Sequence, residues 1–340
     1  MVTLKDIANL TGVSTTTISN VIHGRSNRVS PETVDKVNAA IKELGYIPNM
    51  SARSLASKNS SLVAFINHVI TGNDRNMLED PFHSTAIGAI ERTLSPNGYY
   101  LMLRTVKTTE ELLSFLRNWN VDGLFLTGIF YDEFFDALSS CDIPVVLLDS
   151  YVRHPGICNV GLEDFQGSYL ATRHLIEKGH RRIGFVTPKL RDGGVLQERF
   201  LGYKSALIQA SIPFDESVVF EYEMDTEESC QAAADAIACH RDITGLVASA
   251  DKLAVGIMPG LRRHGIRIPE DLSLIGFDDL PLCSLVTPPL TSIHQDMQKK
   301  AEVAANFMLE LLNGSTPSTP NIILPVSLAE RESVRDLNSR

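Results

Sequence analysis

Short polar side chains gather on one face of a helix that the sequence predicts from Ser14 onward: Thr15, Thr16, Ser19 and Asn20. An asparagine amide can form two hydrogen bonds with the edge of adenine, and a threonine can bond a base or press its methyl group on thymine. A first helix that ends at Gly12 makes the pair a candidate helix-turn-helix, whose second helix enters the major groove of DNA. The alternative is a small helical bundle whose hydroxyl side chains face only water, and the pattern alone leaves both open.

The sequence lacks the residue patterns that other kinds of site require. The five cysteines are scattered without C-x-x-C spacing, so we expect no disulfide framework and place the protein in a reducing cytoplasm. The nine histidines have no H-x-x-x-H spacing, so we expect no bound metal. The glycines form neither G-x-G-x-x-G nor G-x-x-x-x-G-K, and no G-x-S-x-G occurs, so we expect no enzyme and no cofactor. No apolar run is long enough to cross a membrane, and Lys5 and Asp6 stand where a signal peptide needs an apolar stretch.

Capping and terminating residues predict that the candidate helix-turn-helix belongs to an all-helical head. Thr3 can cap a helix that runs to Gly12, and Ser14 can cap the second. A third helix is predicted from the cap Ser30 to the terminator Gly45. Pro48 and Asn49 then favour a fourth short helix that ends before residue 58.

The pattern changes from residue 62, where apolar runs of strand length alternate with amphipathic stretches. We predict strands, buried on both faces, at 62–66, 99–103, 123–126, 145–148, 183–186, 218–220, 246–248 and 272–277. Helical stretches such as 86–94, 166–177 and 253–264 lie between them. This alternation predicts a parallel sheet with helices on both faces, and eight or more strands favour two doubly wound lobes with a ligand cleft between them.

Charge is unevenly spread along the 340 residues. The net charge of −10 argues against a polyanionic partner. Residues 1–60, however, hold seven basic and four acidic side chains, a balance of +3, which leaves −13 for the remainder. This asymmetry favours a basic module that meets an anionic surface, joined to an acidic body with another task.

Several stretches together resemble the LacI/GalR family of transcription regulators. In the head they are TLKDIA (3–8), GVSTTTISNVI (12–22), VSPET (29–33), LGYIPN (44–49) and ARSL (52–55). In the body they are GHRRI (179–183), ERFLGY (198–203), GIRIPEDLSLIGFDD (265–279) and PPLTS (288–292). The resemblance covers essentially the whole chain and implies a homodimeric repressor that binds a palindromic DNA operator and responds to a small-molecule effector, carbohydrate-like, in a core of periplasmic-binding-protein-like (type I) fold.

The resemblance also implies DNA contacts. Thr15, Thr16 and Asn20 match base-reading positions, and Leu55 matches a hinge residue that wedges into the minor groove. The full set expected at DNA is Ser14, Thr15, Thr16, Ser19, Asn20, Arg25, Arg28, Asn49, Arg53 and Leu55.

For the effector, the resemblance implies a site at Phe82, Asp149, Arg199, Asp225 and Asp278. An arginine fork facing a carboxylate suits a polyhydroxyl or polar cyclic ligand, because one supplies donors and the other acceptors. For Asp149 a turn-capping role, and for Phe82 a core position, remain open. Two departures weaken a stacked pyranose as the ligand: Ala250 replaces a ligand-bonding asparagine, and no aromatic stands near Asp225.

The expected organisation has three parts. A DNA-binding head spans 1–48, a hinge helix and linker 49–60, and the core 61–340. Lobe one of the core is expected at about 61–160 and 291–321, and lobe two at about 161–290 and 322–340. The alternative function is a cytoplasmic solute-binding protein of the same core fold, against which the basic head and the missing signal peptide count.

Overall fold

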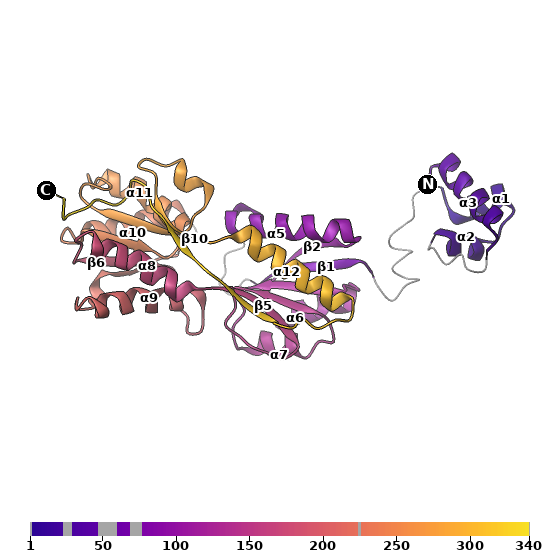
Figure 1. The fold of residues 1–340 in the computed structure, drawn as a ribbon, viewed down its shortest axis with the longest axis horizontal. Coiled ribbons are helices and arrows are strands. Elements are labelled where there is room, and N and C mark those ends of the chain that lie inside the picture. The colour runs from indigo at the N-terminus through magenta and orange to yellow at the C-terminus, as the bar shows by residue number, and fades with distance from the viewer. Residues whose placement is uncertain (1, 23–28, 47–59, 69–76, 224–225, 340) are drawn as a thin grey trace. The chain divides into compact units, whose positions relative to one another are not determined.

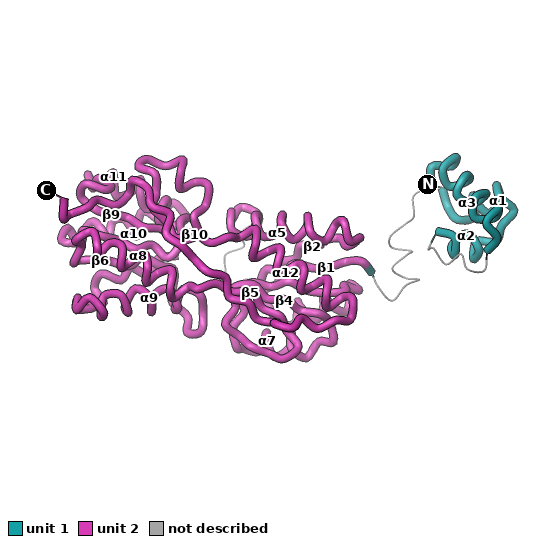
Figure 2. Tube along the Cα trace, in the orientation of Figure 1, with its two compact units in different colours: residues 1–60 teal, residues 61–340 magenta. Residues whose placement is uncertain are grey.

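A computed structural model describes residues 2–22, 29–46, 60–68, 77–223 and 226–339. The chain divides into two compact units, Met1–Ser60 and Ser61–Arg340, which Figure 2 shows in different colours. The first unit holds the predicted head, and the second holds the predicted core.

Three described helices form the first unit: α1 (Leu4–Thr11), α2 (Thr15–Ile22) and α3 (Pro31–Leu44). Each begins as the sequence predicts. The Ser30 side chain accepts a hydrogen bond from the backbone N–H of Thr33, and Pro31 fills the first turn of α3. Their facing sides bury a small core of Ile7, Ile18, Val21, Val37 and Ala40. The fourth helix expected after Pro48 lies outside the described residues.

Lobe one of the second unit is built on a six-stranded parallel sheet with the order β11-β5-β4-β3-β1-β2. Its strands are β1 (Leu62–His68), β2 (Tyr100–Val106), β3 (Gly123–Thr127), β4 (Val145–Leu148), β5 (Ile157–Leu162) and β11 (Asn321–Leu324). One face is covered by α5 (Pro81–Leu94) and α12 (Met297–Leu312), the other by α6 (Thr109–Asn118) and α7 (Glu133–Ser139).

Lobe two repeats this architecture with the strand order β12-β10-β9-β8-β6-β7, in which only β12 runs antiparallel to its neighbour β10. Its strands are β6 (Ile183–Thr187), β7 (Val219–Glu221), β8 (Gly245–Ala248), β9 (Ser273–Asp278), β10 (Thr291–His294) and β12 (Ser327–Ala329). Its helices are α8 (Asp164–Glu177), α9 (Val195–Gln209), α10 (Glu227–Ala238) and α11 (Asp251–Arg263). Short 3₁₀ turns in the core are η2 (Met77–Glu79), η3 (Ser95–Asn97), η4 (Glu216–Val218) and η5 (Pro281–Ser284).

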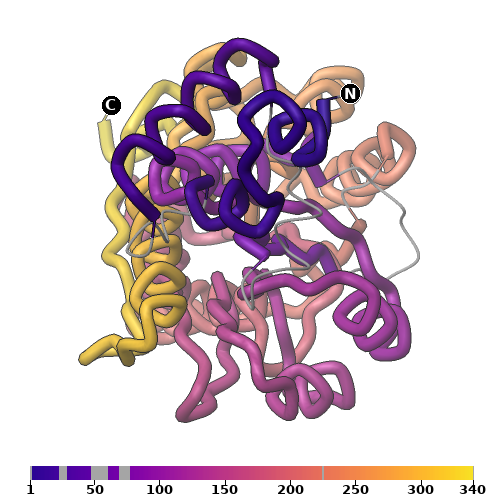
Figure 3. Tube along the Cα trace, turned by 90° about the vertical axis from the view of Figure 1, so that its right-hand side faces the viewer, coloured from indigo at the N-terminus to yellow at the C-terminus, as the bar shows by residue number. Residues whose placement is uncertain are grey.

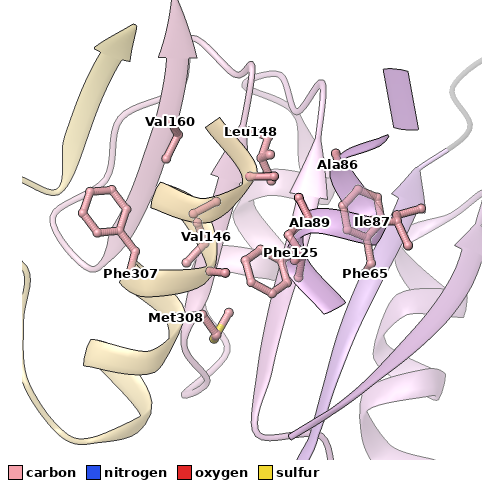
Figure 4. Close-up of a cluster of buried hydrophobic side chains, with 14 of the residues drawn as sticks. Phe65, Ala86, Ile87, Ala89, Phe125, Val146, Leu148, Val160, Phe307 and Met308 are labelled. Atoms are coloured by element: carbon pink, nitrogen blue, oxygen red, sulfur yellow. The ribbon is translucent and has the colours of Figure 1, made fainter. Parts of the chain in front are cut away.

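Alternating side chains bind each sheet to its two helix layers. In β1, Val63 and Phe65 point to one face and Ala64 and Ile66 to the other, and all four are fully buried. Figure 4 shows Phe65 with Phe125 of the neighbouring strand, packed beneath α5 and α12. The two-sided burial predicted for the parallel strands is thus present in β1, β3 and β4. β5 is buried in the same way, although the sequence did not predict it as a strand. For β2 the prediction is wrong, because β2 pairs only with β1 at the sheet edge and exposes much of its surface.

The chain crosses between the lobes at 162–164, 294–297 and 324–327. In Figures 1 and 3 the yellow-orange helix α12 therefore returns to lie on the magenta lobe one. These crossings correct the expected lobe limits. Residues 291–294 form β10 in lobe two, because Ile293 pairs beside Phe277 and packs with it in the core of that lobe. Residues 322–324 belong to β11 in lobe one, where Ile322 pairs with Val160.

Candidate functional sites

The turn between α1 and α2 is held by local hydrogen bonds. Gly12 closes α1 in the left-handed conformation (φ 68°), and its N–H donates to the Ala8 carbonyl over 2.8 Å. Ser14 then starts α2, because its Oγ accepts from the backbone N–H of Thr17 over 3.2 Å. The two helices pack through Ile7 and Ile18, which are fully buried, so one side of α2 is fixed and the opposite side is presented.

The presented side of α2 carries the predicted polar residues. Ser14, Thr15 and Thr16 are exposed, while Ser19 and Asn20 are half-buried. Among the residues that the structure describes, Thr15, Thr16, Ser19 and Asn20 have no side-chain hydrogen bond, so their donors and acceptors are available to a ligand. The other expected DNA contacts, Arg25, Arg28, Asn49, Arg53 and Leu55, lie outside the described residues.

The second unit has a cavity of about 350 Å³ lined by both lobes. Four strand ends of the two sheets reach it, at Asn67 and His68, Thr127 and Gly128, Asp149, and Asp278. This is the place where doubly wound folds bind ligands, since the loops after parallel strands converge there. Four of the five predicted effector residues line it: Phe82, Asp149, Arg199 and Asp278. The fifth, Asp225, lies outside the described residues.

Arg199 is the centre of this site on the lobe-two side. It lies on α9 with 6% of its surface exposed, and its Nε donates to Asp164 Oδ1 over 2.9 Å. Its Nη1 donates to the Ser249 carbonyl over 2.6 Å and lies 3.5 Å from Asp278 Oδ1. The guanidinium carbon also lies 3.5 Å from the ring centre of Phe277, so hydrogen bonds, ion pairs and ring stacking together fix the guanidinium at the cavity.

Asp149, which follows β4, and Asp278, the last residue of β9, have unusual backbone conformations. Their φ values are 51° and 112°, in the region that glycine favours and that costs other residues free energy. Burial and the neighbouring Asp251 raise the pKa of Asp278 to about 7, against the opposing effect of Arg199. Strained backbone and a shifted carboxyl together mark a site that the fold is arranged to present.

A buried lysine that the sequence analysis missed supports both carboxylates. Lys300 of α12 has 0% exposure, and its Nζ donates to Asp149 Oδ1 over 2.6 Å and to Gln295 Oε1 over 2.7 Å. The Gln295 amide in turn donates to Asp278 Oδ1 over 2.6 Å. Lys300 and Gln295 therefore link the carboxylates of the two lobes through one polar chain. Asp149 Oδ2 stays buried and has no hydrogen-bond partner among the described residues.

Three further cavity residues were also missed. His83 follows Phe82 on α5, and burial lowers its pKa, so its ring is neutral at pH 7. Its Nε2 lies 3.3 Å from Thr127 Oγ1. Asp80 and Lys252 face one another from opposite lobes with 3.9 Å between Oδ2 and Nζ, at the margin of the cavity. The lobes are thus connected on both the inner and outer sides of the site.

Other parts of the described chain offer less. A larger cavity of about 580 Å³ lies beside α11, but its lining is mainly apolar, including Val255, Met258 and Ile268, and its Arg267 is held by Asp271. Within the described ranges no three His, Cys, Asp or Glu side chains are grouped to hold a metal ion. No described helix is long and apolar enough to cross a membrane.

Comparisons with known proteins agree with this arrangement. The family model "Bacterial regulatory proteins, lacI family" matches residues 3–49, and "Periplasmic binding protein-like domain" matches 172–334. The HTH-type transcriptional regulator CelR of Thermobifida fusca is 31% identical over 97% of this chain and 98% of its own. The ribose operon repressor of Haemophilus influenzae is 31% identical over 99% of this chain and 100% of its own.

Solved structures extend the likeness to the fold. The Lac repressor dimer bound to operator and the anti-inducer ONPF has a TM-score of 0.82 and 26% identity, covering 98% of this chain and 99% of that one. The complex of the regulator CelR with cellobiose has a TM-score of 0.73 and 30% identity, covering 98% and 100%. The head with its presented α2, the two-lobed core and these full-length relatives together show that the chain belongs to the lacI family of bacterial regulatory proteins.

Proposed function

We propose that this protein represses transcription as a homodimer on a palindromic operator and changes its operator affinity when a small, polar, carbohydrate-like molecule enters the cavity between the core lobes. Family membership supports the DNA-binding regulator, and the Lac repressor relative was solved as a dimer on its operator. A palindrome presents two equal half-sites, which suits two heads related by a two-fold axis.

The observation that carries the effector proposal is the convergence of Asp149, Arg199 and Asp278 on one cavity shared by two lobes. Carboxyl groups accept hydrogen bonds and an arginine fork donates them, which matches a ligand rich in hydroxyl groups. Relatives were solved with cellobiose and with ribose. A ligand that binds both lobes favours one angle between them and thereby changes the population of the DNA-binding form.

At the DNA, we assign base reading to the presented face of α2. Thr15, Thr16 and Asn20 are the proposed readers, and Leu55 is the proposed minor-groove wedge of a hinge helix within 49–60. We further propose that the chain is not an enzyme and works in the cytoplasm, where a bacterial repressor meets its operator. The solute-binding alternative is not favoured, because the family model covers the DNA-binding head.

The test couples the two sites in one measurement. An operator is selected from randomised DNA, and its affinity for the full chain is titrated with cellobiose, ribose, further sugars and nucleobases. We expect one class to change the affinity and Arg199→Lys to abolish the change while operator binding persists, because lysine keeps the charge but not the fork. Arg173→Lys, at an exposed position of α8, is the matched control. Failure to select any operator sequence would overturn the proposed function.

A further inference from the structure

A second, smaller cavity adjoins the ligand cavity. Its volume is about 150 Å³, and Gly128, Asp149 and Val195 line both spaces. The remaining wall comes mainly from the loop after β6 and the start of α9. A ligand held by Asp149 could therefore place one of its groups in the smaller space.

Two cationic side chains of that loop line the smaller cavity, Lys189 and Arg191. The Arg191 guanidinium is fixed with its carbon 4.0 Å from the ring centre of Phe130. Its Nη1 is buried and has no hydrogen-bond partner among the described residues. Neither cation forms a salt bridge with a described residue. Arg191 is half-buried and Lys189 is exposed, so both cations keep surface that an anion entering the smaller cavity can contact.

The backbone adds donors at the same place. α9 has 15 residues, and Gly194, which precedes its first residue, has no side chain to cap it. Gly194, Val195 and Leu196 line the cavity, so the start of the helix lies at the cavity wall. A Cβ at Gly194 would lie 2.8 Å from the Phe130 ring, so glycine lets this ring and the helix start come together.

The charges of the combined cavity are unequally placed. In the larger space, Asp278 faces Arg199 and Asp80 faces Lys252. In the smaller space the one carboxylate, Asp149, is already matched by Lys300, which leaves Lys189 and Arg191 as uncompensated cations. Asp149 lines both cavities, so its carboxyl group lies at the junction of the two spaces.

We infer that the effector is an anionic derivative of a polyhydroxyl molecule, with a phosphate or carboxylate held by Lys189, Arg191 and the start of α9 and its hydroxyl-bearing body in the larger cavity. This inference rests on the proposed function, because it takes the cleft to be the effector site. The competing outcome is that the effector is a neutral sugar and that Arg191 lines the cavity without binding a charged group.

The experiment compares matched neutral and anionic ligands on the full-length protein. Ribose with ribose 5-phosphate, glucose with glucose 6-phosphate, and glucose with gluconate are titrated by calorimetry at low and high salt, with inorganic phosphate alone as a further probe. The phosphate and carboxylate arms separate the two sources of charge. We expect the anionic member of at least one pair to bind about tenfold tighter or more at low salt, with a smaller preference at high salt.

Variants locate the effect. Lys189→Gln combined with Arg191→Gln should reduce the preference to about twofold or less, and Arg191→Lys should keep part of it. Arg173→Gln, on the exposed side of α8, should change nothing. Equal or tighter binding of the neutral member in every pair, or a full preference in the double variant, would overturn the inference.

The inference is equally overturned if neither phosphate nor any anionic ligand raises the melting temperature of the parent more than that of the double variant. A neutral sugar that binds and alters operator affinity would overturn this inference while leaving the proposed function standing.

Discussion

Replacement of Lys300 by methionine tests the buried polar chain that joins the two lobes. Methionine has a similar length and no charge, so the change removes the ammonium and leaves the packing of α12 nearly intact. Asp149 Oδ1 and Gln295 Oε1 then lose their 2.6 Å and 2.7 Å donors. The Asp149 side chain is only 11% exposed, so its charge would be left largely without water or a partner.

The loss of stability expected for Lys300→Met follows from the burial of the Asp149 side chain. Breaking a buried ion pair by removing one partner costs about 3–5 kcal/mol, because the remaining charge is uncompensated. At about 2 °C per kcal/mol for a core of this size, the melting temperature should fall by roughly 6–10 °C. Asp149→Asn should cost a similar amount by leaving the ammonium unpaired. The double variant, in which neither charge remains, should be more stable than the two single changes summed by about 2 kcal/mol.

Urea unfolding of the four proteins measures this cycle. Trp119, the one tryptophan of the chain, lies at the end of α6 in lobe one, so its fluorescence follows the lobe that contains Lys300. Additivity within about 0.5 kcal/mol would refute the ion pair as a stabilising unit. A Lys300→Met protein as stable as the parent would refute the burial argument as well.

Two further predictions concern the head and the cleft. Thr16→Ala or Asn20→Ala should weaken the free energy of operator binding by about 1–3 kcal/mol and relax base preference at particular half-site positions. If the variants select the same sequences from a randomised operator library as the parent does, the assignment is contradicted. The pKa of Asp278 rises to about 7 in the folded core. Between about pH 4 and about pH 7 the folded core therefore keeps a proton on Asp278 that the unfolded chain has released. The free energy of unfolding consequently falls as pH rises through this range. Asp278→Asn should reduce that slope by up to about 1.4 kcal/mol per pH unit, measured by urea unfolding, and an unreduced slope would assign the proton elsewhere.

Local signals explain why most elements were predictable. Ser30, Pro31 and Gly45 mark both ends of α3, since capping and termination depend on residues within one turn. The strands β1, β3 and β4 are short apolar runs between polar segments, which the sequence shows directly.

Elements that depend on distant partners were not predictable in the same way. β11 and β12 have four and three residues and are only partly buried, so their pattern is too short to stand out. The sheet that β10 joins is decided by its pairing with β9, which no local pattern records.

In the site, strand ends and the resemblance pointed to Asp149, Arg199 and Asp278. Lys300 was missed because a helical lysine is normally exposed. Its one local signal is its place beside Met297, Ala301 and Ala304 in the buried stripe of α12.

The crossings between the lobes also set the order in which the molecule can be completed. As the ribosome delivers the chain from its N-terminus, lobe one emerges first but lacks α12 and β11, which come only with residues 297–324. Its apolar sheet face under α12 therefore stays uncovered until nearly all of lobe two has been made. Translation of an mRNA that ends shortly before the codon for residue 297 would release a chain with that apolar sheet face exposed. Chaperones would bind such a chain, and proteases would degrade it.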